Sequence, residues 1–161
     1  MTTLSLLIPT HREDRPLRRA LESVRAQLLD DDEVLVVGDT HDGALPGVEA
    51  LVAEFGHPYR YLEHDAGGHD FGHSQLNYAI TQAKGDYIHV NDDDDIYTPD
   101  ALQAFREMTA TVHAPIPFLF RFKSYVGGIV RIFAGGRGWF PVRTRLPSKP
   151  SPMVMTRPRR P

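Results

Sequence analysis

The chain has 161 residues, of which 41% are hydrophobic and 24% charged, with a net charge of -3, as is ordinary for a soluble globular protein. This length allows one domain with a substantial core and is too short for two domains of full size. The sequence contains no cysteine, which excludes disulfides, thiolate metal sites and a cysteine nucleophile and fits a reducing, cytoplasmic compartment.

Short apolar runs alternate with amphipathic segments in the first two thirds of the chain, the pattern typical of helices packed over a mostly parallel sheet. Buried strands are predicted at residues 4–8, 34–37, 59–62 and 87–90. Helical stripes of apolar side chains are predicted over residues 17–28, 48–55 and 76–83 and again after residue 99. The sequence therefore predicts a single α/β unit over residues 1–112.

Prolines, glycines and a threonine set the predicted boundaries of these elements. Pro9 is expected to end the first strand, and Pro16 suits the first turn of the first helix, where its missing N–H is not needed. Gly85 is expected to cap the third helix in the left-handed conformation. Thr98 is expected to cap the fourth helix with its hydroxyl, just ahead of Pro99.

Charge divides the chain into two different segments. Residues 1–107 hold all 21 acidic side chains and 8 basic ones, whereas residues 108–161 hold 10 basic side chains and no acidic one. Eight of the 13 prolines lie at positions 115–161. A basic, proline-rich extension can contact an anionic surface, but its composition favours a solvated segment, and we expect no nucleic-acid partner.

Two further strands are predicted beyond the first unit, at residues 118–123 and 129–133. We assign residues 113–134 to a partial second unit and residues 135–161 to an irregular or disordered tail. Basic side chains interrupt the apolar segment 116–133, which is compatible with peripheral contact to a membrane or with core strands that lack their partners. No uncharged stretch approaches the length of a transmembrane helix, and the N-terminus lacks the basic region of a signal peptide.

The strongest candidate for chemistry is the acidic run at the exit of the strand predicted at residues 87–90. Asp92, Asp93, Asp94 and Asp95 are consecutive, and their mutual repulsion is costly unless a cation or abundant water is present. Hard oxygen ligands of this kind suit Mg²⁺ or Mn²⁺. The run therefore predicts a divalent metal site, with an acidic turn that merely precedes a helix as the alternative.

Two other strand exits carry polar side chains, at the edge where open α/β sheets place their ligand crevice. After the first strand, Thr10 offers a hydroxyl and Arg12 a positive charge to a diphosphate. After the second strand, Asp39 can accept a hydrogen bond from a base or a ribose. Taken alone, Asp39 is explained more simply by an Asx-type turn.

The sequence lacks the glycine-rich motifs of the common nucleotide folds. The first strand-to-helix turn contains no glycine, so the G-x-G-x-x-G fingerprint is absent, and no G-x-x-x-x-G-K-[ST] phosphate loop occurs. These absences argue against a nicotinamide enzyme or a P-loop NTPase. If a diphosphate binds at this sheet, a metal held by carboxylates is the most plausible source of positive charge.

A glycine-rich loop between the third strand and the third helix contains His69 and His73, whose spacing invites a metal interpretation. The two histidines flank a loop and not an established helix, so the spacing does not place them on one face. We predict instead that this polar loop borders a nucleotide pocket.

In this order and spacing, the strand exits resemble those of the family-2 glycosyltransferases. The resemblance lies in residues 6–10 with Arg12, in residues 36–39, and in residues 83–88 followed by the acidic run 92–95. It covers about residues 3–108 and implies the Rossmann-like GT-A fold, a nucleotide-diphospho-sugar donor, and Mn²⁺ or Mg²⁺ bound at a D-x-D motif. Residues 113–134 would then belong to the acceptor side.

The resemblance also implies roles by position. Thr10 corresponds to the residue beside the nucleotide, Asp39 to the base-reading carboxylate and Asp94 to the metal-bridging carboxylate, with Asp93 or Asp95 in that role if the register shifts by one. Gly38 replaces the first of two paired aspartates in the family. The candidate donor-binding residues are Thr10, Arg12, Asp39, Asn77, Asp92 and Asp93, and the candidate metal ligands are Asp94, Asp92 and Asp95.

The activity implied is metal-dependent transfer of a sugar to an unknown acceptor. The family's catalytic base is a carboxylate from the second half of the domain, but residues 108–161 contain no Asp or Glu, so no base is assigned. One alternative is a catalytically inactive fragment that binds the nucleotide sugar. A Mg²⁺-dependent phosphohydrolase is less well supported, since the first strand ends at Pro9 and Thr10 without a nucleophilic aspartate.

After about residue 134 the composition changes toward glycine, arginine and proline. Translation of GC-rich DNA in a shifted reading frame tends to give such a composition. We therefore expect a truncated or altered version of a longer glycosyltransferase. The donor sugar, its base, the acceptor and the stereochemical outcome are not specified by these residues.

Overall fold

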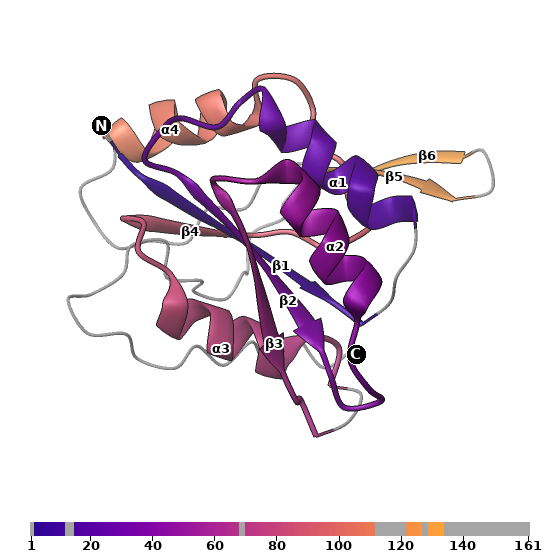
Figure 1. Cartoon of the computed structure of the whole chain (residues 1–161). Coiled ribbons are helices and arrows are strands. Elements are labelled where there is room, and N and C mark those ends of the chain that lie inside the picture. Colours follow the sequence, from indigo (N-terminus) through magenta and orange to yellow (C-terminus); the bar gives the residue numbers. More distant parts are fainter. Residues whose placement is uncertain (1, 12–14, 68–69, 112–121, 127–128, 134–161) are drawn as a thin grey trace, which may run out of the picture.

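The computed structural model describes residues 2–11, 15–67, 70–111, 122–126 and 129–133. Along the chain the elements are β1 (Leu4–Thr10), α1 (Arg15–Arg25), β2 (Glu33–Asp39), α2 (Pro46–Phe55), β3 (Tyr59–His64), α3 (His73–Gln82), β4 (Tyr87–Val90), α4 (Ala101–Thr111), β5 (Phe122–Val126) and β6 (Ile129–Phe133) (Figure 1). The predicted alternation of strands and helices in the first unit is confirmed.

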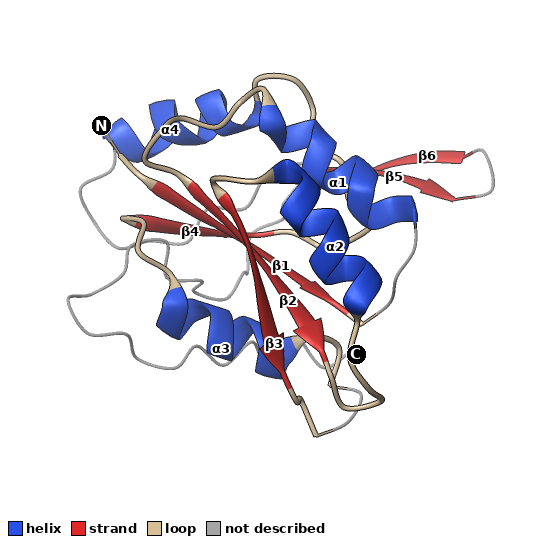
Figure 2. Cartoon of the chain, in the orientation of Figure 1, coloured by secondary structure: helices blue, strands red, loops and turns tan. Residues whose placement is uncertain are grey.

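The first four strands form one parallel sheet in the order β3-β2-β1-β4 (Figure 2). The chain steps outward from β1 to β2 and β3, and then crosses back through α3 to place β4 on the other side of β1. The direction of winding therefore changes between β1 and β4, which is where open α/β sheets bind their ligands, beside the carboxyl ends of the strands.

Helices cover both faces of this sheet. Side chains of β1 alternate between them: Leu6 and Ile8 pack in the core under α1, α2 and α4, whereas Leu7 packs in the core under α3. Figure 1 shows α3 alone on its side of the sheet, opposite α1 and α2. Because both faces are buried, β1 and β2 are apolar throughout their centres, and polar side chains concentrate at the sheet edges.

Pro9 does not end the first strand, contrary to the expectation. Pro9 pairs with Val37 of β2, and β1 continues to Thr10. The carbonyl of Leu7 accepts a hydrogen bond from the Asn91 N–H at 3.0 Å, so the backbone groups of Pro9 face the same side, beyond the last residue of β4. Among the strands that the structure describes, none lies there to need an N–H from residue 9, so proline is tolerated.

Two predicted helix caps are also wrong. α3 ends at Gln82, its cap residue Ala83 has extended backbone angles, and Gly85 is not left-handed. α4 begins only at Ala101, after a turn in which the Ala101 N–H bonds the Thr98 carbonyl at 3.2 Å and Asp100 has a φ of 67°. α3 thus ends before its predicted cap at Gly85, and α4 begins later than its predicted cap at Thr98 indicated.

The second unit appears as a β-hairpin in which β5 and β6 pair antiparallel, with Phe122 opposite Phe133. Its second strand matches the predicted run at residues 129–133, while residues 118–121 lie outside the described residues. The division into units at residues 113–134 and 135–161 stays a prediction. Within the described ranges, no helix has both the length and the apolar character that crossing a bilayer requires.

Gly85 lies against β1 because its backbone approaches that strand closely. Its N–H donates to the Ser5 hydroxyl at 2.8 Å. A Cβ atom at position 85 would lie 2.6 Å from the Ser5 nitrogen and 2.7 Å from the Leu4 carbonyl carbon. These neighbours are backbone atoms of a central strand, so they cannot move aside without disturbing the sheet.

We therefore expect Gly85→Ala to lower the free energy of unfolding by about 1–3 kcal/mol, as other overpacking substitutions do. Urea denaturation of the two proteins measures the difference. Lys84→Ala, at the exposed neighbouring side chain, is the matched control and should stay within about 0.5 kcal/mol of the parent. Equal stability of Gly85→Ala and the parent would contradict the close approach.

His89 of β4 is held in an aromatic environment beneath α4. Its Nδ1 lies 2.9 Å from the Tyr97 hydroxyl, and its ring meets the Phe105 ring edge-on with 5.5 Å between centroids. Burial lowers the pKa of His89 from 6.5 to about 4. The native protein therefore holds this imidazole neutral at pH values where an unfolded chain would bind a proton.

This shift makes the fold sensitive to acid. Above pH 6.5 the imidazole is neutral in both states, and between pH 6.5 and 4 only the unfolded chain takes up the proton, so stability falls as the pH is lowered. The loss attributable to His89 is about 3 kcal/mol, at roughly 1.4 kcal/mol per pKa unit. Urea denaturation at several pH values should show a shallower decline for His89→Gln than for the parent; parallel curves would contradict the assignment.

Candidate functional site

The carboxyl ends of the four parallel strands gather the predicted site residues at one edge of the sheet. Thr10 ends β1 and Asp39 ends β2. The acidic run 92–95 follows β4 directly. The first turn of α3 lies at the same edge, since a Cβ atom on Gly72 would be 3.1 Å from the Cβ of Pro9.

Thr10 and Asp93 join the exits of β1 and β4 across the switch point. The Thr10 hydroxyl donates to Asp93 Oδ2 at 2.6 Å, and the two residues are only 1% and 7% exposed. A charge-assisted hydrogen bond of this length is among the stronger ones that side chains make. Asp93, which we predicted to bind the donor, thus has a structural role in fixing the acidic turn, and its contact with a donor stays a prediction.

Asn91 organises the rest of the acidic turn. Its side-chain amide donates to the carbonyl of Asp92 at 3.0 Å and to the carbonyl of Asp95 at 3.3 Å. The Asp95 N–H closes the turn onto the Asp92 carbonyl at 3.2 Å. Sequence reasoning missed this role of Asn91, although an Asn that begins a polar turn is a recognised signal for side-chain to backbone bonds.

The carboxylates of this turn repel one another. Partial desolvation at the sheet edge raises the pKa of Asp92, whose side chain still reaches solvent, and the neighbouring Asp94 and Asp93 raise it further. The pKa of Asp95 is raised by burial and then by Asp92 and Asp94. Both shifts mean that Asp92 and Asp95 lie among like charges, a repulsion that a bound cation would relieve.

The donor set fits a divalent cation shared with a ligand better than one fully enclosed by protein. Across the described residues, no three His, Asp or Glu side chains are arranged to hold a metal together. Mg²⁺ is commonly bound through one or two carboxylates together with substrate phosphates. Asp94 is exposed at the tip of the turn, and Asp92 and Asp95 are exposed beside it, so these carboxylates are accessible to such an ion.

Asp39 forms the Asx-type turn that its sequence context indicated. Its Oδ1 accepts hydrogen bonds from the N–H of His41 at 3.0 Å and from the N–H of Ala66 at 3.3 Å. The carboxylate thereby ties the loop after β2 to the loop after β3. The side chain is half-buried at the sheet edge, and its contact with a base stays a prediction.

Gly38 is small because Tyr61 of β3 fills the space beside it. A Cβ atom at position 38 would collide with the Tyr61 hydroxyl and lie 3.0 Å from Cε2 of that ring. The replacement of the family's first paired aspartate by Gly38 is therefore accompanied by an aromatic ring on the neighbouring strand. Only Asp39 is left to offer a carboxylate at the end of β2.

The structure gives less information about the other predicted residues. Asn77 is exposed on α3, at the position where the resemblance places it near a nucleotide sugar. Arg12 and His69 lie outside the described residues. His73 is the first residue of α3. The roles of Arg12 and Asn77 in donor binding therefore stay predictions.

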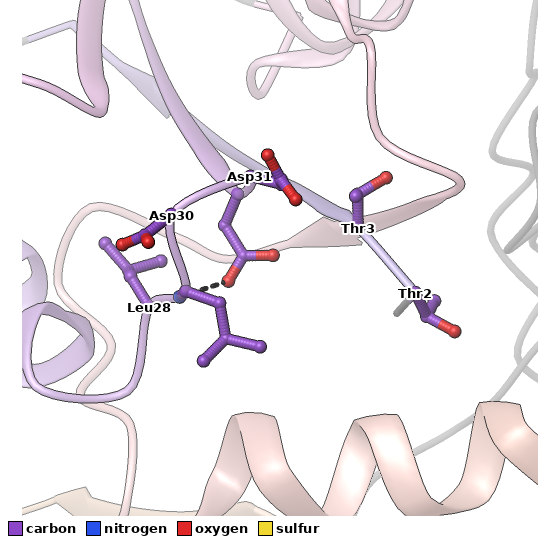
Figure 3. A pocket seen from close by; sticks show the side chains of 7 residues that line it. Thr2, Thr3, Leu28, Asp30 and Asp31 are labelled. Atoms are coloured by element: carbon purple, nitrogen blue, oxygen red, sulfur yellow. Dashed lines mark hydrogen bonds between the residues drawn. The ribbon is translucent and has the colours of Figure 1, made fainter.

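A cavity lies at the opposite, amino edge of the sheet (Figure 3). It has a volume of about 250 Å³ and is lined by Thr2, Thr3, Leu28, Leu29, Asp30, Asp31 and Asp32. Asp32 accepts hydrogen bonds from the N–H groups of Leu4 at 3.0 Å and Leu29 at 2.8 Å, and it pairs with Arg106. Its carboxylate therefore holds elements of the fold together and is paired with a cation.

The sequence itself decides the family. Residues 5–151 match the sequence model described as "Glycosyl transferase family 2". The chain belongs to the family-2 glycosyltransferases. The family resemblance predicted from the strand exits is thus confirmed.

Relatives and solved structures agree with this membership. The chain is 32% identical over 100 residues to an uncharacterized glycosyltransferase of Rickettsia bellii, covering 62% of this chain and 14% of the relative. It is 32% identical over 111 residues to the succinoglycan biosynthesis protein ExoW of Rhizobium meliloti, covering 68% and 35%. The structure of S. aureus TarS 1-349 superposes with a TM-score of 0.61 at 19% identity, covering 71% of this chain and 34% of TarS.

The structural likeness confirms the predicted GT-A fold, a Rossmann-like parallel sheet flanked by helices. The chain spans about a third or less of the length of these relatives and of TarS. The matched part includes the parallel sheet and its carboxyl edge, where the acidic turn lies. The family-2 glycosyltransferase assignment therefore applies to the region that carries the candidate site.

The hydrogen bond between Thr10 and Asp93 should be measurable as stability. We expect Thr10→Val, which keeps the side-chain shape but removes the donor, to lower the free energy of unfolding by about 1–3 kcal/mol, because a buried carboxylate loses a partner. Thr10→Ser retains the hydroxyl and should lose less. Urea denaturation of the three proteins checks the order; a Thr10→Val protein as stable as the parent would show that the bond does not hold the turn.

Proposed function

We propose that this chain binds a nucleotide-diphospho-sugar together with Mn²⁺ or Mg²⁺ and provides the donor-binding part of a glycosyltransferase acting on an unknown acceptor. The observation that carries this proposal is the acidic turn at the switch point, in which Asp92 and Asp95 have raised pKa values while Asp94 stands exposed between them. A diphosphate cannot approach four carboxylates unless a cation lies between the two groups.

Asp94, with Asp92 or Asp95 as a second ligand, would hold the metal together with the diphosphate; when bound, the metal neutralises the charge that develops on the departing nucleoside diphosphate. Thr10 and Asp93 keep this turn in position across the strand gap, and Asp39 accepts a hydrogen bond from the base. Arg12 and Asn77 complete the proposed donor contacts. Solved structures with the same fold support the ligand class: S. aureus TarS in complex with UDP-GlcNAc, and a mannosyltransferase of Pyrobaculum calidifontis in complex with GDP-Man and Mn²⁺.

A second candidate is donor binding without transfer. Residues 108–161 contain no Asp or Glu, so the family's carboxylate base has no counterpart in that segment. A donor-hydrolysis assay separates the two candidates: binding without turnover favours the inactive fragment. We also propose a cytoplasmic location and peripheral contact with a membrane through residues 116–133.

The metal assignment is tested by isothermal titration of UDP, GDP and their sugar conjugates, with Mn²⁺ and with EDTA. We expect Asp94→Asn to weaken nucleotide binding at least tenfold in Mn²⁺, because the substitution removes a charged carboxylate ligand of the metal. In EDTA the variant and the parent should bind equally weakly. A tenfold change in Kd corresponds to about 1.4 kcal/mol of binding free energy, which the loss of one charged metal ligand can account for.

Asp31→Asn is the matched control, since Asp31 is an exposed carboxylate in a run of the same kind at the amino edge. It should bind nucleotides as the parent does. Unchanged Mn²⁺-dependent affinity in Asp94→Asn would remove that residue from the metal site. Absence of nucleotide binding by the parent under all conditions would overturn the proposed function.

A further inference from the structure

The segment that follows the acidic turn is fixed to helix α1. The chain leaves the turn at Ile96, whose side chain is 51% exposed, and enters the core again at Tyr97, which is 9% exposed. The Tyr97 N–H donates to the Ser23 hydroxyl at 3.0 Å, and that hydroxyl donates in turn to the Ala20 carbonyl at 2.7 Å. Asp95 therefore lies two residues before a backbone group that a helix of the fold holds in place.

The side chain of Tyr97 is held as well, by the strand that leads into the acidic turn. Its hydroxyl lies 2.9 Å from Nδ1 of His89 in β4, within hydrogen-bond distance. Contacts at the backbone and at the far end of the ring together fix both the place and the direction of this residue. The acidic turn is thus connected to the sheet through β4 before Asp92, and to α1 and β4 through Tyr97 after Asp95.

Gln27 connects the same segment to the end of α1 and to the start of α4. Its amide nitrogen donates to the Ser23 carbonyl at 2.9 Å and to the Thr98 carbonyl at 3.1 Å. Its amide oxygen accepts a hydrogen bond from the Leu102 N–H at 3.1 Å. The last carbonyls and the first N–H groups of a helix have no partner within that helix. One glutamine therefore satisfies such a group at the end of α1 and another at the start of α4, where the two helices meet (Figure 1).

These contacts oppose the repulsion within the acidic turn. Asp92 and Asp95 lie among like charges, so without a cation any movement that separates the carboxylates would be favourable. Moving Asp95 outward would draw Tyr97 away from the Ser23 hydroxyl and out of the core. Ligands that are held in place before an ion binds do not have to be ordered on binding, which favours affinity.

We propose that Ser23 and Gln27 are positioning residues of the metal site. Through the backbone of residues 97–98 they hold the downstream end of the acidic turn, so that its carboxylates stay where a divalent cation can bind. Both side chains make their hydrogen bonds within the fold and act on the ion only through the turn. This inference rests on the proposed function, because it deepens the same site.

Ser23→Ala tests this role, because it removes the hydroxyl that accepts the Tyr97 N–H. Isothermal titration of the better bound of UDP and GDP is repeated over a series of Mn²⁺ concentrations. We expect the Mn²⁺ concentration that gives half of the full gain in nucleotide affinity to rise about tenfold, the lower end of what contacts behind metal ligands contribute. In EDTA the affinity should equal that of the parent. Ser23→Thr keeps the hydroxyl and should restore the parental Mn²⁺ requirement.

Gln27→Met removes the amide at a similar side-chain length and should also raise the Mn²⁺ requirement. Gln103→Met is the matched control, with the same substitution beside Leu102. The Gln103 amide donates to Glu107 at 2.8 Å on the exposed face of α4. This control should match the parent at every Mn²⁺ concentration.

The remaining outcomes count against the proposal. A parental Mn²⁺ requirement in Ser23→Ala or in Gln27→Met overturns the role of that residue and leaves the proposed function standing, whereas a parent that binds no nucleotide overturns both. An equal loss of affinity in Mn²⁺ and in EDTA, or no restoration by Ser23→Thr, would show a general structural role and would also overturn the inference. If Gln27→Met fails to fold, the two Ser23 variants decide.

Discussion

The hydrogen bond from Thr10 to Asp93 is the constraint on which the arrangement of this edge depends. β4 pairs with β1 only through residues 87–90, so backbone pairing ends where the acidic run begins. Repulsion among four adjacent carboxylates would move this segment away from the end of β1 there. The Thr10 hydroxyl fixes one of them to β1, and the Asn91 amide fixes the turn through its carbonyls. The remaining carboxylates are thereby held near one another despite their repulsion.

The chain carries two runs of consecutive aspartates, and the structure uses them in opposite ways. At the amino edge, Asp32 is satisfied by two backbone N–H groups and by Arg106, so that run links β1, the loop before β2 and α4. At the carboxyl edge, no cation within the described residues forms an ion pair with Asp92 or Asp95, and their pKa values are raised. Composition alone does not distinguish the two runs; the distinction comes from which edge of a parallel sheet each one reaches.

The periodicity of apolar side chains was sufficient to predict the elements of the parallel sheet, because burial on both faces leaves a clear pattern. The family was indicated by the residues at the strand exits, in their order and spacing. The periodicity was not sufficient where a residue's role depends on a distant backbone. Pro9 is tolerated because β4 ends early, and Gly85 is required because β1 passes beside it. Asn91 is an intermediate case: an Asn before a polar turn indicates bonds to the backbone, but the local pattern does not show that its amide would reach the carbonyls of both Asp92 and Asp95.

The carboxyl edge of the sheet favours a metal together with a nucleotide over either one alone. Like charges around Asp92 and Asp95 raise both pKa values, which a cation would relieve. A cation held by the one or two carboxylates that the described residues can offer keeps coordination positions open, and phosphate oxygens can fill them. The Asp39 carboxylate at the end of β2 only accepts hydrogen bonds, so it suits a ligand that also donates, as a base or a ribose does. A nucleoside diphosphate with its metal combines these properties in one ligand.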